Sequence, residues 1–106
     1  QQFLVHQLED FKSKGYKVIG YGASHSTGIL VHHLGLSGYL DYLIDDNPSK
    51  YGTYMPGTNL QVFGRSSILA ENMVVIIILA WQYFSTLYDN IRSTGFNGPI
   101  IKPILP

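Results

Sequence analysis

The chain has 106 residues, which suits one domain with one hydrophobic core. Its seven basic and seven acidic residues cancel, which argues against nucleic acid as the main partner, because binding a phosphate backbone needs an excess of lysine and arginine. The chain has no cysteine, so disulfides and thiolate metal sites are excluded, and a reducing, cytoplasmic setting fits. Its longest apolar run, residues 73–81, is too short to span a bilayer, and we expect no membrane partner.

The chain opens with the pattern of an amphipathic helix over residues 1–14. Leu4, Leu8 and Phe11 recur on one stripe, and Gly15 stands where a helix would end. The chain starts at Gln1 rather than methionine. We therefore expect a single domain over residues 1–106, cut from the C-terminal part of a longer protein, with residues 1–15 as a leading helix.

A short apolar strand, residues 16–21, runs into a glycine-rich loop, residues 22–26. A strand, two glycines and a helix in this order are typical of nucleotide-binding α/β domains, because glycine lets a phosphate approach the backbone at a helix N-terminus. The fingerprint is incomplete, since its third glycine would fall at His25. Both a ligand site and a plain tight turn stay open, and the candidate binding residues are Gly20, Tyr21, Gly22, Ser24, His25 and Ser26.

The next helix is expected to run to about Leu34, with Thr27, Leu30 and Val31 on its inward stripe. His32 and His33 are adjacent, and neighbouring side chains on a helix point about 100° apart. We therefore interpret this pair as surface residues and expect no metal site.

The second strand, residues 39–44, runs into Asp45 and Asp46. An acidic residue at this place in a nucleotide-binding domain lies near the ribose hydroxyls. The alternative is a capped turn, because Asp and Asn side chains hydrogen-bond their own backbone.

A loop rich in Gly, Pro and Tyr follows over residues 49–59, and Tyr54 offers either a stacking surface or part of a flap over the core. A third strand is expected over residues 60–63, then a brief helix capped by Ser66 or Ser67. Residues 73–80 predict a fully buried strand, because they are apolar throughout.

Trp81 and Tyr83 follow that buried strand at the edge where open α/β sheets bind ligands. A helix over residues 82–94 and a final strand over residues 98–106, broken at Pro103, complete the pattern. Strands and helices that alternate in this way predict a three-layer α/β fold with a mostly parallel five-stranded sheet, strand order 3-2-1-4-5, and helices on both faces.

Four phrases of this sequence resemble one family in the same order: residues 20–24, residues 44–58, residues 79–81 and residues 101–106. The most specific is Asp-Asn-Pro-x-Lys-x-Gly-x-Tyr-x-Pro-Gly-Thr, residues 46–58. Together they resemble the C-terminal, Rossmann-like domain of S-adenosylmethionine-dependent sugar C-methyltransferases, which act on nucleotide-linked sugars. Here His25 stands where relatives usually have a lysine or a similar residue. If that lysine contacts phosphate in the relatives, a neutral histidine would make the same contact only weakly.

The resemblance implies that the cofactor is bound by a methyltransferase domain outside this chain, so we expect no cofactor and no catalysis from these residues alone. The expected partners are that domain and a nucleotide-sugar, held by the glycine-rich turn, Asp45 or Asp46, Tyr54, Trp81 and Tyr83. Two alternatives stay open. One is a free-standing nucleotide- or NAD-binding domain, with His25 as its candidate base. The other is a degenerate fold kept for packing or homodimerisation through its exposed aromatic residues.

Overall fold

The structure is a computed structural model that describes residues 2–103. Part of the final strand predicted from the sequence, residues 104–106, lies outside the described residues. The helices and strands are α1 (Gln2–Ser13), β1 (Lys17–Tyr21), α2 (His25–His33), β2 (Tyr42–Ile44), β3 (Val62–Phe63), β4 (Val74–Ile78), α3 (Phe84–Ser93) and β5 (Ile100–Ile101). Three short 3-10 helices join them: η1 (Pro48–Lys50), η2 (Arg65–Ala70) and η3 (Trp81–Tyr83).

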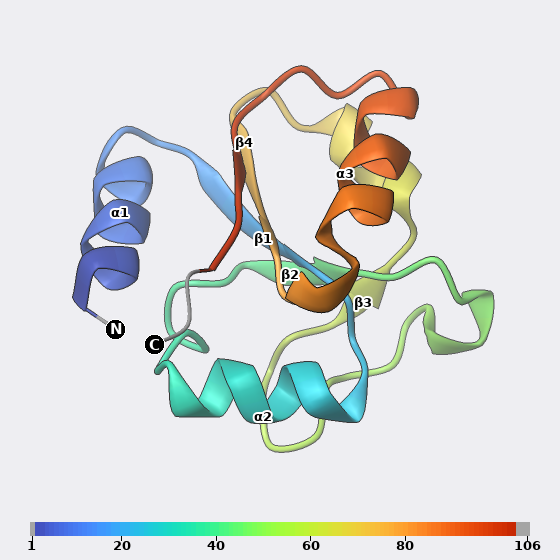
Figure 1. Ribbon diagram of the computed structural model, residues 1–106, viewed down its shortest axis with the longest axis horizontal. Helices are drawn as coiled ribbons and strands as arrows, with labels where there is room; N and C mark the ends of the chain where they lie inside the picture. The colour runs from blue at the N-terminus through green and yellow to red at the C-terminus, as the bar shows by residue number, and fades with distance from the viewer. Residues whose placement is uncertain (1, 104–106) are drawn as a thin grey trace.

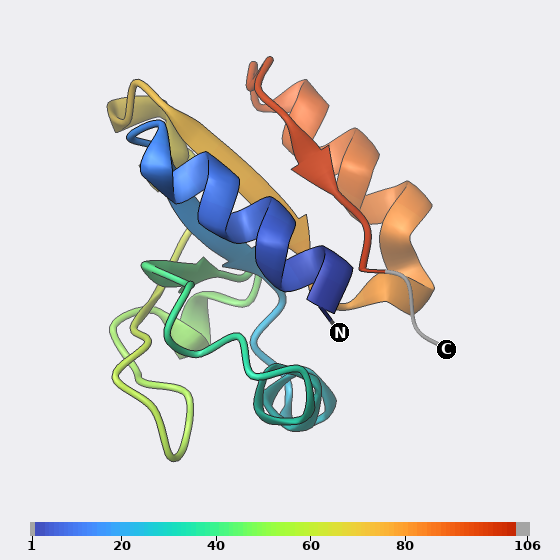
Figure 2. The same cartoon turned by 90° about the vertical axis from the view of Figure 1, so that its left-hand side faces the viewer.

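The five strands form one sheet in the order β3-β2-β1-β4-β5, and every named pair is parallel. This confirms the fold and strand order predicted from the sequence. Figure 1 shows α1 and α3 on opposite sides of the sheet, with α2 beneath it, and Figure 2 shows the same layers turned by 90°.

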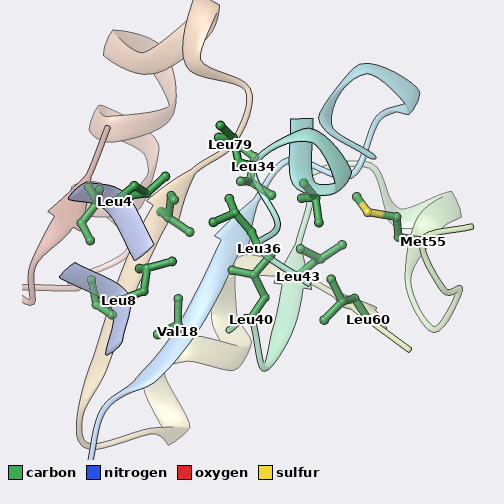
Figure 3. Close-up of a cluster of buried hydrophobic side chains, with 14 of the residues drawn as sticks. Leu4, Leu8, Val18, Leu34, Leu36, Leu40, Leu43, Met55, Leu60 and Leu79 are labelled. Atoms are coloured by element: carbon green, nitrogen blue, oxygen red, sulfur yellow. The ribbon is translucent and has the colours of Figure 1, made fainter. Parts of the chain in front are cut away.

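Two hydrophobic clusters cover the two faces of the sheet, because successive side chains of a strand point in opposite directions. The first cluster joins Val18 of β1 and Val75 of β4 to residues from α1 and α2 (Figure 3). The second joins Ile19 and Ile76 to residues of α3, including Ile91. All five residues of β4 are buried, as its continuous apolar sequence predicted.

Several boundaries differ from the sequence-based expectation. The second strand starts at Tyr42 rather than at residue 39. Leu36 accepts hydrogen bonds from the Tyr39 and Leu40 amides in a turn, and the Asp41 carboxylate accepts the Val18 amide at 2.8 Å. The Asp41 carboxylate thus binds an amide of β1 that would otherwise pair with the backbone of β2.

The helical boundaries also differ in three places. His25 and Ser26 belong to α2 and not to the loop before it, because the helix is capped one residue earlier, at Ser24. The prediction that Ser66 or Ser67 caps the brief helix is wrong, since that segment is the 3-10 helix η2, which starts after Gly64 without a side-chain cap. The last helix begins at Phe84, after η3.

Gly20 provides a test of the packing between the sheet and the first cluster. A Cβ atom at this position would lie 2.7 Å from Leu79 Cδ1 and 2.8 Å from Leu43 Cδ2. We expect Gly20→Ala to lower the free energy of unfolding by about 1–3 kcal/mol, because buried leucines must shift to admit the methyl group.

The matched control is Gly38→Ala, where the added methyl group meets nothing within 4 Å. We expect it to leave stability unchanged or raise it slightly, because alanine restricts the unfolded chain. Urea unfolding of both variants measures the difference. Equal stability of the two variants would contradict the tight packing at Gly20.

Candidate functional site

The carboxyl ends of three neighbouring strands meet at the glycine-rich turn. Tyr21, the last residue of β1, pairs with Ile44 and Ile78, the last residues of β2 and β4. The Gly22 amide donates to the Ile44 carbonyl at 2.9 Å. Residues 22–24, 45–48 and 79–83 therefore lie at one edge of the sheet, the edge at which open parallel sheets bind ligands.

Gly22 is required at this turn for two reasons. Its φ angle is +110°, which residues with a side chain rarely adopt. A Cβ atom there would lie 3.1 Å from Ala80 Cβ and 3.3 Å from the Ala80 amide nitrogen. The chain therefore turns from β1 into α2 while in contact with the end of β4.

Of the polar residues that follow the turn, some form hydrogen bonds at the start of α2 and others are exposed. Ser24 caps α2, accepting from the Thr27 amide at 3.4 Å, and its hydroxyl lies 3.0 Å from that of Ser26. Thr27 is buried and donates to the carbonyls of Gly22 and Ser24. The His25 side chain is exposed and makes no hydrogen bond within residues 2–103.

Asp45 holds the glycine-rich turn from the β2 side. One of its carboxylate oxygens accepts the Ala23 amide at 2.9 Å, and the other accepts the Asn47 amide at 2.9 Å. Lys50 secures the other side of the same residue, since its Nζ donates to the Ala23 carbonyl at 3.0 Å. The structure thus places Asp45 in a turn-holding role, which leaves its predicted contact with a ribose hydroxyl untested.

A cavity of about 540 Å³ lies between α2 and the loop that joins β2 to β3. The walls come from the start of α2, from one face of that helix, from Ser37, and from a turn of the loop. The lining residues are Ala23, Ser24, His25, Gly28, Ile29, Val31, His32, Ser37, Met55, Pro56, Gly57 and Thr58. None of them is Lys, Arg, Asp or Glu, so the cavity suits an uncharged group with a few hydrogen-bonding atoms.

The loop wall of the cavity is a tight turn anchored in the core. The Thr58 amide donates to the Met55 carbonyl at 3.1 Å, with Pro56 and Gly57 between them and a φ of +77° at Gly57. Proline followed by glycine with positive φ is the pattern of a type II turn. Met55 itself is buried at 3% exposure, and Figure 3 shows its side chain pointing into the first cluster. The wall therefore has a fixed position relative to the sheet.

Tyr21 and Asp46 do not face this cavity. Tyr21 belongs to the cluster on the α3 side of the sheet, and its hydroxyl donates to the Asp46 carboxylate. Arg65 pairs with the same carboxylate at 2.7 Å and also donates to the Asn90 carbonyl. Burial first, and the hydrogen bond to Asp46 second, raise the pKa of Tyr21 well above its ordinary value. This group fastens α3 and η2 to the ends of β1 and β2.

The three remaining aromatic candidates lie on the surface. Tyr54 is 58% exposed in the loop, and Trp81 and Tyr83 are 44% and 63% exposed in η3. None of them lines the cavity. Of the predicted site residues, the structure brings only Ser24 and His25 to the cavity wall, with Gly20 and Gly22 buried behind them.

Sequence reasoning missed Ile29, His32, Lys50 and the Met55–Thr58 turn as site residues. The signal on the helix was the spacing of positions 25, 28, 29 and 32, which share one face of an α-helix. His32 is exposed, as expected, and also lines the cavity. Within residues 2–103, no three side chains of the metal-binding types gather at one place, and no helix is long and apolar enough to cross a bilayer.

The role of Asp45 predicts a stability effect. We expect Asp45→Ala to lower the free energy of unfolding by about 1–3 kcal/mol, because two backbone amides lose a charged acceptor. Asp89→Ala is the control, since Asp89 is exposed on α3 and has no polar partner within the described residues. We expect it to change stability by less than about 0.5 kcal/mol. Chemical unfolding measures both, and a neutral Asp45→Ala would refute the turn-holding role.

The raised pKa of Tyr21 predicts a pH dependence. Because the folded protein holds this proton more tightly than the unfolded chain, the stabilisation is complete below pH 10 and is lost as the pH rises toward the folded-state pKa. Above pH 10 the wild type should lose about 1.4 kcal/mol per pH unit relative to Tyr21→Phe. Unfolding at pH 7–11 tests this, with Tyr83→Phe as a control that keeps the wild-type pH profile. Parallel profiles for the wild type and Tyr21→Phe would contradict it.

Comparison with known proteins identifies a family. A search of curated proteins found no similar one. The family model described as the C-methyltransferase C-terminal domain matches residues 1–104, nearly the whole chain. The glycine-rich turn, the Asp46–Thr58 segment and the end of β4 all lie within the matched region. The chain belongs to the C-methyltransferase C-terminal domain family.

Proposed function

We propose that this domain holds a nucleotide-linked sugar while an S-adenosylmethionine-dependent methyltransferase domain, outside this chain, transfers the methyl group. The observation that carries the proposal is the cavity of about 540 Å³ beside the glycine-rich turn. Its volume lies in the range of small-ligand sites, and Ala23 and Ser24 of the glycine-rich turn form one end of its wall. Membership of the C-methyltransferase family supports the reaction class.

The cavity offers the chemistry that a nucleoside or a sugar needs. The Ser24 hydroxyl and the rings of His25 and His32 supply hydrogen bonds, while Ile29 gives an apolar surface that is 59% exposed. No catalytic group is required from this domain. His25 has no hydrogen-bonding partner in the described residues that would orient it as a base, which argues against a free-standing enzyme.

Two features argue against a dinucleotide such as NAD. The Ala23 amide, which would point at a diphosphate in a dinucleotide-binding turn, already donates to Asp45. The carboxylate of Asp45, the residue placed to meet the ribose hydroxyls of a dinucleotide, is turned to the backbone amides of Ala23 and Asn47. The proposal leaves S-adenosylmethionine to the methyltransferase domain outside this chain.

A second candidate function is an interface. Trp81 and Tyr83 both lie in η3 and are exposed, and aromatic residues are enriched at protein interfaces. This surface is separate from the cavity, so it suits contact with the methyltransferase domain or with a second copy without blocking ligand entry.

The test is thermal unfolding of this chain with UDP-, GDP-, CDP- and dTDP-linked sugars, S-adenosylmethionine and NAD. A ligand at 100 times its dissociation constant adds about 2.7 kcal/mol, which should raise the midpoint by about 10 °C in a domain of this size. We expect a shift with a nucleotide-sugar and none with S-adenosylmethionine. A shift with NAD alone, or silence across the panel, would contradict the proposal, and silence would favour the interface.

A cavity-filling variant ties the shift to the site. In Gly28→Leu the Cβ atom meets Met55 only at ordinary contact distances, 3.7–3.9 Å, while the rest of the side chain enters the cavity. We expect it to fold and to lose the shift. Ser85→Leu adds a side chain of the same size on the exposed surface of α3 and should keep the shift.

A further inference from the structure

Resting on the proposed function, we propose that the cavity holds the nucleoside end of the substrate, that Lys50 binds its diphosphate, and that the sugar stays outside for the methyltransferase domain. Three observations lead to this orientation: the uncharged cavity lining, the carboxylate that closes the glycine-rich turn, and the Lys50 ammonium, which pairs with no carboxylate in the described chain.

The cavity rejects the charged part of a nucleotide-sugar. Its lining contains no Lys or Arg, and burying a diphosphate without cations is costly. Ile29, Val31, Met55 and Pro56 form its apolar surface, which suits the flat faces of a nucleobase. The two histidine rings and the Ser24 hydroxyl are available to the base edges and the ribose. The Thr58 hydroxyl already donates to the Met55 carbonyl and accepts the Leu60 amide.

The glycine-rich turn does not take the diphosphate either. In dinucleotide-binding domains the backbone amides after the glycines face the phosphates. Here the Asp45 carboxylate lies 2.9 Å from the Ala23 amide nitrogen, so a negative charge already occupies that place. A diphosphate brought to the same amide would be repelled by Asp45.

Lys50 is the cation left for the diphosphate. Of the seven Lys and Arg residues, Lys12, Lys14, Lys17 and Arg65 pair with carboxylates. Arg92 and Lys102 lie over aromatic rings. In the described chain, Lys50 has neither kind of partner.

The position of Lys50 matches the cavity. Its ammonium has three N–H donors, and the described contacts use one of them, on the Ala23 carbonyl at 3.0 Å. Ala23 lines the cavity, and the half-buried Lys50, though not itself a lining residue, is bound to that residue. A nucleoside in the cavity can therefore place its 5′ phosphate groups toward Lys50.

The orientation follows from the reaction. A methyl transfer requires the sugar carbon to come within about 3–3.5 Å of the methyl donor, and the proposed function places that donor in another domain. The reacting sugar must therefore stay accessible. The nucleoside takes no part in the reaction, and its binding energy serves to position the sugar.

The experiment follows backbone amide shifts by NMR in this chain. The probes are thymidine, uridine, cytidine and guanosine, their diphosphates, and a free hexose. We expect one nucleoside to shift the amides of residues 23–29 and 55–58, and its diphosphate to bind about tenfold more tightly, because a charged hydrogen bond is added. The free sugar should shift neither segment.

Two pairs of variants separate the base site from the phosphate site. Ile29→Asp should weaken the binding of the nucleoside and of its diphosphate by about tenfold or more. Leu69→Asp, at 57% exposure on η2, should change neither affinity. Lys50→Gln should remove the tenfold preference for the diphosphate and leave nucleoside affinity unchanged. Lys14→Gln, at an exposed ion pair of α1, should keep the preference.

The outcomes distinguish this orientation from the proposed function. If nucleotide-sugars bind but the free sugar, rather than the nucleoside, shifts the cavity amides, the orientation is wrong and the proposed function stands. If Lys50→Gln weakens the binding of the nucleoside as much as that of the diphosphate, Lys50 only supports the turn. The assignment of Lys50 to the diphosphate is then wrong. If no nucleotide-sugar binds, the proposed function itself fails.

Discussion

The contact between the glycine-rich turn and the end of β4 is the constraint on which the rest of this structure depends. Gly22 lies so close to Ala80 that a methyl group would not fit comfortably, and its positive φ angle turns the chain from β1 into α2. Because the end of β1, residues 19–21, is paired with both β2 and β4, the direction of α2 is fixed by the sheet. The cavity wall that α2 forms is therefore fixed relative to the sheet.

Side chains of the protein itself bind the backbone amides and carbonyls of this turn. Asp45 and Lys50 bind the amide and the carbonyl of Ala23, and Thr27 binds the carbonyls of Gly22 and Ser24. In a dinucleotide-binding domain part of this hydrogen bonding is left to the ligand. Here the amide and the carbonyl of Ala23 are both paired within the protein, and the cavity lies beside the turn, along the neighbouring face of α2.

Different structures are anchored at the strand ends on the two faces of the sheet. On the α3 side, Tyr21, Asp46 and Arg65 form a bonded group that fastens the outer elements to the strand ends. On the α2 side, the strand ends support a loop whose buried Met55 holds one cavity wall in place. Asp45 and Asp46 are adjacent in sequence but serve opposite sides, because successive side chains of an extended chain alternate.

The sequence by itself determined the layered fold, the strand order and the edge where the strand ends meet, since these follow from apolar periodicity, glycine positions and the handedness of crossovers. It also marked Ser24 and His25 as site residues. Only the tertiary structure decided that Asp45 closes the turn and that residues 55–58 face α2. Those contacts join segments more than twenty residues apart, and no local pattern specifies which side chain meets which backbone group across that separation.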